Sequence, residues 1–159
     1  MTNPFELTAT DAIKLIGNNK LSRYEWVQSC FERIREKEDL VKAWVYLDEE
    51  RALEKAKQLD NENNVSQIGI PFGIKDIIDA SNTPTGFGTN FYQNNVPMRD
   101  AASVSVAKQS GCIFIGKTVS TELGHRAPGL TTNPHNKDFT PGGSSSCLLY
   151  TSPSPRDDR

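Results

Sequence analysis

The sequence predicts an α/β protein in which helices alternate with short buried strands. Apolar residues recur at helical spacing in segments that begin with capping residues, whereas other segments are short, rich in β-branched residues and bounded by Gly, Pro or Asp. In chain order these segments read helix, helix, strand, helix, strand, helix, strand, which is typical of a layered α/β architecture. A length of 159 residues allows one domain with a hydrophobic core.

The first two predicted helices carry clear start signals. A helix over 9–16 has Thr8 as a candidate N-cap and Gly17 as a stop. The next helix begins at a capping box, in which the Ser22 hydroxyl and the Glu25 carboxylate each accept a hydrogen bond from the other residue's backbone N–H. Its expected buried face contains Val27, Cys30, Phe31 and Ile34.

The middle of the chain is predicted to contain a strand, a third helix and an irregular region. Alternating apolar residues predict a strand over 41–47, and Asp48 is placed to cap a third helix. The region 82–99 is rich in Pro, Gly and Asn and is expected to be irregular. The other expected elements are a strand around Lys75, a helix that Asp100 caps and that runs to Ser110, a strand over 112–115 that ends at Gly116, and a brief helix over 118–124.

The most apolar stretch of the chain, residues 68–79, has Lys75 at its centre. An ammonium group in a buried strand loses most of its hydration energy, so it needs a partner or becomes neutral. A neutral buried lysine is a proton acceptor. The alternative is a lysine at a strand end, paired with Asp76 or Asp79, with its head group at the surface. The stretch alone leaves both interpretations open.

Composition and charge exclude several classes of protein. A net charge of −2 argues against a nucleic-acid surface or a membrane-surface helix, and no apolar run approaches membrane-spanning length. The N-terminus lacks a secretory signal pattern. Cys30, Cys112 and Cys147 are odd in number and far apart, so we expect free thiols and a cytoplasmic setting. His125 and His135 are expected to be polar loop residues and not metal ligands.

A second polar segment lies near the end of the sequence, where Gly142 and Gly143 precede three consecutive serines. The two glycines permit backbone angles that other residues resist. Taken alone, the segment is typical of a flexible polar turn. An anion cradle at a helix N-terminus is a further interpretation, although the lysine and glycine spacing of a phosphate-binding loop is absent.

Taken together, these segments resemble the amidase signature family. Each match is weak alone, but the matches run in the family's order from residue 68 to residue 146. The matching segments are 73–76, 100–101, 111, 115–118, 122–123, 128–129, 133–136 and 140–146.

The resemblance implies a fold, a reaction and site residues. The fold is a mixed β-sheet surrounded by helices, of which this chain holds the N-terminal part. The reaction is hydrolysis of a carboxamide to an acid and an amine or ammonia by a Ser–cis-Ser–Lys triad, with a small-molecule amide as substrate and no metal or organic cofactor. Lys75 matches the neutral base, and Ser144 matches the bridging serine, which follows a cis peptide bond in the family. Gly142, Gly143 and Ser145 match supporting positions.

The attacking serine of the triad has no match in this sequence. In the family it lies in a further Gly-Gly-Ser segment downstream of the bridging serine, and the serines after Ser146, at 152 and 154, lie between prolines in no such context. We therefore expect the activity to belong to the full-length parent and the fragment itself to be inactive, because triad residues act as a unit.

The last segment, residues 147–159, looks like translated adapter DNA from a sequencing library. The family continues after the serines with Gly and small residues, whereas this sequence changes abruptly at Cys147. We therefore expect residues 1–146 to be the N-terminal portion of an amidase domain and residues 147–159 to be a non-native tail. Cys147 is accordingly not interpreted as a functional thiol.

Three functions stay open at the level of sequence. Ala127, Pro128 and Gly129 look more like the loop of free-standing amidases, which favours a free-standing hydrolase. The first alternative is the glutamine-hydrolysing subunit of a tRNA-dependent amidotransferase, which needs partner subunits. An alternative of another class is a non-catalytic anion-binding module that uses the turn at 142–146.

Overall fold

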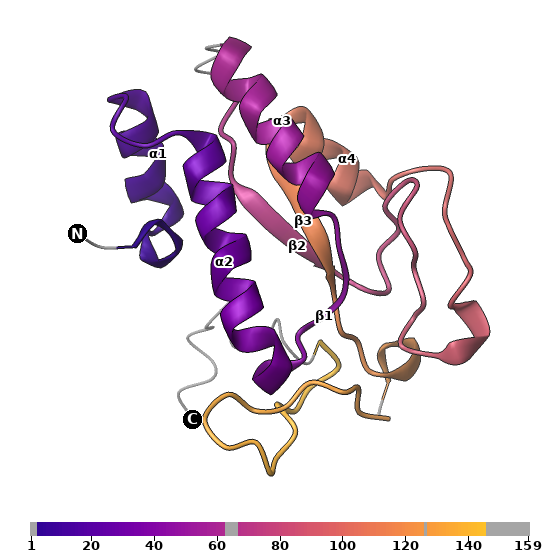
Figure 1. Cartoon of the computed structure of the whole chain (residues 1–159). Helices are drawn as coiled ribbons and strands as arrows, with labels where there is room; N and C mark the ends of the chain where they lie inside the picture. The colour runs from indigo at the N-terminus through magenta and orange to yellow at the C-terminus, as the bar shows by residue number, and fades with distance from the viewer. Residues whose placement is uncertain (1–2, 63–66, 126, 146–159) are drawn as a thin grey trace. The chain divides into compact units, whose positions relative to one another are not determined.

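The computed structural model describes residues 3–62, 67–125 and 127–145 (Figure 1). Helices and strands alternate in the order that the sequence predicts, so the α/β class is confirmed. The helices are α1 (Ala9–Gly17), α2 (Arg23–Val41), α3 (Glu49–Glu62) and α4 (Ala102–Gln109), the strands are β1 (Trp44–Leu47), β2 (Pro71–Lys75) and β3 (Ile113–Thr118), and the 3-10 turns are η1 (Pro4–Glu6), η2 (Asn90–Tyr92) and η3 (Glu122–Gly124).

The strands form a three-stranded sheet in the order β1-β3-β2. The backbone N–H of Ile113 donates to Ile70 O at 2.8 Å, and that of Asp76 donates to Thr118 O at 3.0 Å. Residue numbers rise together along β2 and β3, so these two strands are parallel.

Strand β1 runs the other way. Asp48 N donates to Ile115 O at 3.0 Å, and Val119 N donates to Ala43 O at 2.8 Å, so the numbers rise in one strand as they fall in the other. The sheet is therefore mixed, as the resemblance implied.

The chain divides into two compact units. The first contains Met1–Glu36, Leu47–Gly73 and Ala102–Gly116, and the second contains Lys37–Tyr46, Ile74–Ala101 and Lys117–Arg159. Every residue to which the sequence analysis assigns a catalytic or supporting role belongs to the second unit.

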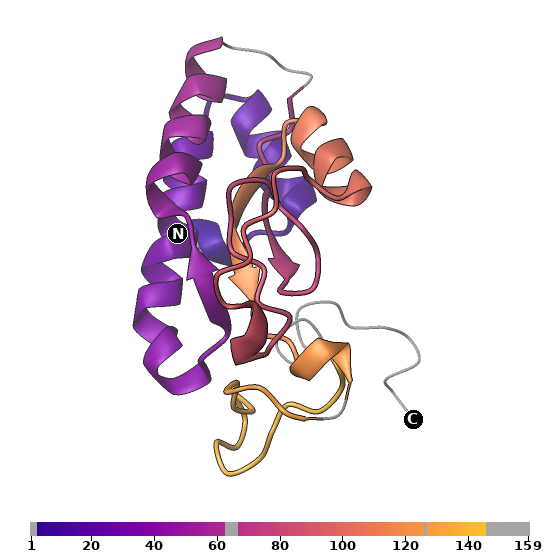
Figure 2. The ribbon, with the colours of Figure 1, turned by 90° about the vertical axis from the view of Figure 1, so that its right-hand side faces the viewer.

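In the first unit, helices pack on the strands from both sides. Arg23 at the start of α2 pairs with Asp60 near the end of α3 at 3.4 Å, whereas Arg35 farther along α2 pairs with Glu49 at the start of α3 at 2.6 Å. These pairs align the two helices antiparallel. Figure 2 shows α3 and α4 on opposite sides of β2 and β3. The buried core of this unit includes Ala12, Trp26, Val27, Phe31, Ala52, Ala56, Leu59, Val104, Ile113 and Ile115.

Two of the predicted helix N-caps are confirmed. The Thr8 side chain accepts a hydrogen bond from Asp11 N. At the start of α2, Ser22 N donates to the Glu25 carboxylate at 2.8 Å, and Glu25 N donates to Ser22 Oγ at 3.0 Å. Two backbone donors that would otherwise lack partners are thus satisfied.

Three predicted boundaries are wrong by more than two residues, and α1 extends one residue beyond its predicted end, through Gly17. Val41 ends α2, and Lys42 follows it with a left-handed φ of 53°, which is a common way for a helix to end, so the strand begins only at Trp44. Strand β3 does not end at Gly116 but continues to Thr118, because its backbone stays paired with β2. The brief helix predicted from residue 118 is reduced to the 3-10 turn η3.

None of the described helices combines the length and the apolar character that crossing a membrane requires. Cys30 and Cys112 are free thiols, as expected, and burial raises the pKa of Cys30 to about 11. Cys147 lies outside the described residues.

The capping box at α2 gives a first testable prediction. Replacing Ser22 by Ala removes the hydroxyl that accepts from Glu25 N, so we expect the free energy of unfolding to fall by about 1 kcal/mol. Urea denaturation followed by circular dichroism measures the change. Ser103→Ala, at an exposed position in α4, is the matched control and should change stability by less than about 0.5 kcal/mol. Equal losses in both variants would contradict the assigned role of the cap.

Candidate active site

Lys75 is the last residue of β2, and its side chain is buried in the second unit. The residue is only 8% exposed, and its Nζ donates a hydrogen bond to Ser144 Oγ at 3.1 Å. Among the described residues, Lys75 takes part in no ion pair. Burial lowers the pKa of this amine below its ordinary value of 10.5. The structure thus places Lys75 against a hydroxyl, and the alternative of a surface lysine paired with Asp76 or Asp79 is wrong.

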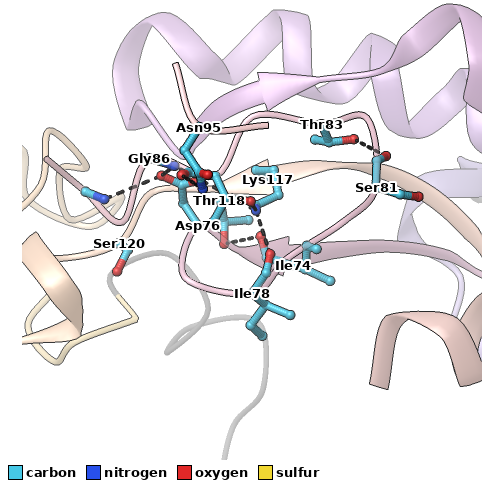
Figure 3. Close-up of polar contacts among 12 residues, drawn as sticks. Ile74, Asp76, Ile78, Ser81, Thr83, Gly86, Asn95, Lys117, Thr118 and Ser120 are labelled. Carbon is cyan, nitrogen blue, oxygen red and sulfur yellow. Dashed lines mark hydrogen bonds and ion pairs between the residues drawn. The ribbon is translucent and has the colours of Figure 1, made fainter. Parts of the chain in front are cut away.

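Asp76 follows Lys75 directly in the sequence but has other partners. It lies in the turn after β2, which ends at Lys75. The carboxylate of Asp76 accepts from Gly86 N at 3.1 Å, and it forms an ion pair with Lys117 Nζ at 3.6 Å (Figure 3). The adjacent carboxylate is thereby occupied by a different lysine.

The segment that carries Ser144 depends on its two glycines. Gly142 and Gly143 have φ values of 75° and 65°, in the left-handed region that residues with a Cβ rarely adopt. The backbone carbonyl of Ser144 accepts from Thr121 N at 3.3 Å and from Thr121 Oγ1 at 3.1 Å. These contacts hold the backbone of Ser144 beside the loop that follows β3.

The peptide bond before Ser144 differs from what the resemblance implied. All peptide bonds between described residues are trans, including the one that joins Gly143 to Ser144. Outside proline, a trans bond is favoured over a cis bond by several kcal/mol. Ser145 is half-buried, and its supporting role stays a prediction.

A cavity of about 300 Å³ adjoins Ser144 in the second unit. Its wall includes Thr121, His125, Pro128 and Gly129. The loop around these residues and Ser144 thus line the same cavity. Across the residues whose placement is described, no cluster of three or more His, Cys, Asp or Glu could hold a metal ion.

Two residues of the site were missed by sequence reasoning. Lys117 lies in the Ile-Gly-Lys-Thr match but received no role, because the expected strand ended at the glycine before it. In the structure, β3 continues past Gly116 to Thr118, so Lys117 lies on a buried strand. Thr121 carried no signal, since its contact with Ser144 spans a separation of 23 residues.

Comparison with known proteins gives a clear family assignment. The family model described as Amidase matches residues 25–147. The chain belongs to the amidase signature family. The resemblance drawn from the sequence motifs is therefore confirmed, although the last matched residue and the tail from 147 onward lie outside the described residues.

Curated relatives match the chain at moderate identity. The A subunit of glutamyl-tRNA(Gln) amidotransferase from Endomicrobium trichonymphae is 34% identical over 146 residues, which cover 85% of this chain and 30% of that protein. Its counterpart from Bacillus thuringiensis (strain Al Hakam) is 34% identical over 151 residues, covering 89% of this chain and 31% of that protein. The chain thus spans about a third of the length of these relatives.

Solved structures share the fold. Peptide amidase from Stenotrophomonas maltophilia superposes with a TM-score of 0.80 at 25% identity, over 91% of this chain and 33% of that one. Fatty acid amide hydrolase superposes with a TM-score of 0.82 at 24% identity, over 92% of this chain and 28% of that one. Both comparisons identify the chain as part of the amidase signature fold.

The burial of Lys75 predicts a pH dependence of stability. Because its pKa is lowered in the folded chain, the unfolded chain binds more protons between the folded and the unfolded pKa. The free energy of unfolding should therefore rise with pH through that window, up to about 10.5. Lys75→Met removes this titration, so the stability of the variant relative to the unmodified chain should be greatest at neutral pH and fall as pH rises.

Denaturation curves between pH 7 and pH 10.5 measure the effect. Lys20→Met, at an exposed position of the first unit, is the matched control, and its stability relative to the unmodified chain should stay level over the same range. A level difference for Lys75→Met as well would show that Lys75 is not desolvated.

Proposed function

We propose that the parent protein of this chain hydrolyses carboxamides and that Lys75 and Ser144 form the inner part of its proton relay. The observation that carries the proposal is the 3.1 Å hydrogen bond between the buried Lys75 amine and the Ser144 hydroxyl. Membership of the amidase signature family supports the same reaction. Because the chain spans about 30% of its curated relatives, the activity is proposed for the whole parent.

Each group has a distinct task in the relay. Burial favours the neutral form of Lys75, whose lone pair can accept a proton. The hydroxyl of Ser144 both donates and accepts, so it passes a proton to Lys75 as it takes one from the attacking serine. The resemblance assigns that attacking serine to a segment with no match in this sequence.

The proton and bond changes balance over two steps. The attacking oxygen forms a bond to the amide carbon as its proton moves to Ser144 and the proton of Ser144 moves to Lys75. The C–N bond then breaks, and the relay returns the proton to the leaving nitrogen, which departs as an amine or ammonia. Water attacks the resulting ester by the same relay, which releases the acid and restores the serine.

A second candidate is the glutamine-hydrolysing component of a tRNA-dependent amidotransferase. The 34% identity to curated amidotransferase subunits favours it, whereas the loop around Pro128 and Gly129 favours a free-standing amidase. Both candidates use the same relay and differ in substrate and partners. The cytoplasmic setting and the anion-binding alternative stay predictions.

Activity of the whole parent protein tests the proposal. We expect release of amine or ammonia from a panel of simple and aryl carboxamides, without added metal or cofactor. Hydrolysis of glutamine only in the presence of partner subunits would assign the protein to the amidotransferases. Binding of inorganic phosphate without hydrolysis of any amide would support the anion-binding module and overturn the hydrolase.

Substitutions in the parent assign the relay. Lys75→Met removes the proton acceptor and Ser144→Ala removes the bridging hydroxyl, so each should lower kcat/KM by roughly 10²–10⁴-fold. The double variant should lose little more than either single variant, because the two residues act as one unit. Lys20→Met is the control and should leave kcat/KM unchanged. Multiplied losses in the double variant would show that the two side chains work independently.

A further inference from the structure

Lys117 is a second buried lysine, and it belongs to the second unit, on the strand beside Lys75. Its side chain is 0% exposed. Its Nζ donates to Ile78 O at 2.6 Å and to Thr85 Oγ1 at 2.7 Å, and it lies 3.6 Å from Asp76 Oδ1 (Figure 3). An ammonium group has three donors, and these three acceptors match them. The network therefore suits the charged form of Lys117.

Asp76 is equally enclosed. In addition to Lys117, its carboxylate accepts from Gly86 N at 3.1 Å and from Gly88 N at 3.4 Å, and the residue is 4% exposed. Gly88 has a φ of 66°, and a Cβ there would lie 2.7 Å from Ser120 O, so only glycine fits. The loop is thus folded closely around the carboxylate.

The position of this ion pair matters because Asp76 follows Lys75 directly. A buried carboxylate without a counter-ion would favour the ammonium form of any amine nearby. Lys117 supplies the counter-ion from β3 and also anchors the loop between Ile78 and Thr85. Within the described part of the chain, the only polar partner of the Lys75 side chain is then the Ser144 hydroxyl.

We propose that Lys117 is a positioning residue for the Lys75–Ser144 pair. By pairing with Asp76, Lys117 leaves Lys75 with a hydroxyl, and not a carboxylate, as its partner. The inference deepens the proposed function, because it concerns the same amine. It stands on the geometry of the described residues alone and does not require that the parent hydrolyses an amide.

The causes of the pKa changes at Lys117 and at Lys75 agree with these different roles. For Lys117, burial lowers the pKa, while the charges of Asp76 and Asp79 and a hydrogen bond to Asp76 oppose that change. For Lys75, burial lowers the pKa and no carboxylate opposes it. Gly124, in the turn that also contains Glu122 and precedes His125, approaches Lys75 closely, since a Cβ on Gly124 would lie 3.9 Å from Lys75 Nζ.

A double-mutant cycle on the complete chain tests the proposal. The pKa of Lys75 is read from the ¹³Cε and ¹⁵Nζ resonances of labelled lysines as a function of pH. Lys117→Met leaves the Asp76 carboxylate without its counter-ion, so the pKa of Lys75 should rise by about one to three pH units. Asp76→Asn combined with Lys117→Met removes both charges and should return the pKa of Lys75 to within about half a unit of its original value.

The double variant separates charge from structural support. If Lys117 only supports the loop, Lys117→Met frees Lys75 to solvent, and adding Asp76→Asn leaves the pKa of Lys75 high; that result would overturn the proposal. An unchanged pKa in Lys117→Met would overturn it as well. Lys20→Met is the control for loss of a positive charge elsewhere and should leave Lys75 unaffected.

If either variant that lacks Lys117 fails to fold, the single variant Asp76→Asn tests the proposed role of Lys117. With the carboxylate gone, only the charge of Asp79 still opposes that of Lys117, so the positive charge beside β2 grows and the pKa of Lys75 should fall further. A pKa that stays the same or rises would contradict the proposal. None of these outcomes depends on catalysis, so failure here would leave the amidase proposal to its own activity test.

Discussion

The arrangement of the site depends on the different surroundings of two neighbouring side chains at the end of one strand. Lys75 and Asp76 are adjacent in sequence, but their amine and carboxylate do not pair with each other. Each instead finds a partner far along the chain, Ser144 for the lysine and Lys117 for the aspartate. This separation allows the amine to be desolvated without a neutralising charge, which is the condition for a lysine that accepts protons.

The buried ion pair has a structural cost that its hydrogen bonds offset. Desolvating two charges is unfavourable, and the gain depends on satisfying their remaining donors and acceptors. Here backbone groups from Ile78, Gly86 and Gly88 and the hydroxyl of Thr85 do so. Breaking such a pair from one side is expected to cost about 3–5 kcal/mol, so the pair contributes to the stability of the loop around Asp76.

Local signals predicted much of the fold, whereas the site depended on recognising a family. Caps at Thr8 and at Ser22 are short-range patterns with a direct physical cause, and the structure contains both. By contrast, the contact between Lys75 and Ser144 spans 69 residues, and no spacing rule could supply it. Lys117 was missed because a glycine before a lysine was interpreted as the end of a strand. The bond before Ser144 is trans, which differs from the cis geometry that the family resemblance implied.

The most direct test of the account is the ¹⁵Nζ resonance of Lys75 when Ser144 is replaced by Ala. The account predicts that this resonance shifts, since its hydrogen-bond acceptor is lost, while the resonances of the exposed lysines stay in place. An unchanged Lys75 resonance in a folded Ser144→Ala chain would show that the amine and the hydroxyl are not in contact, and the proposed relay would have no structural basis.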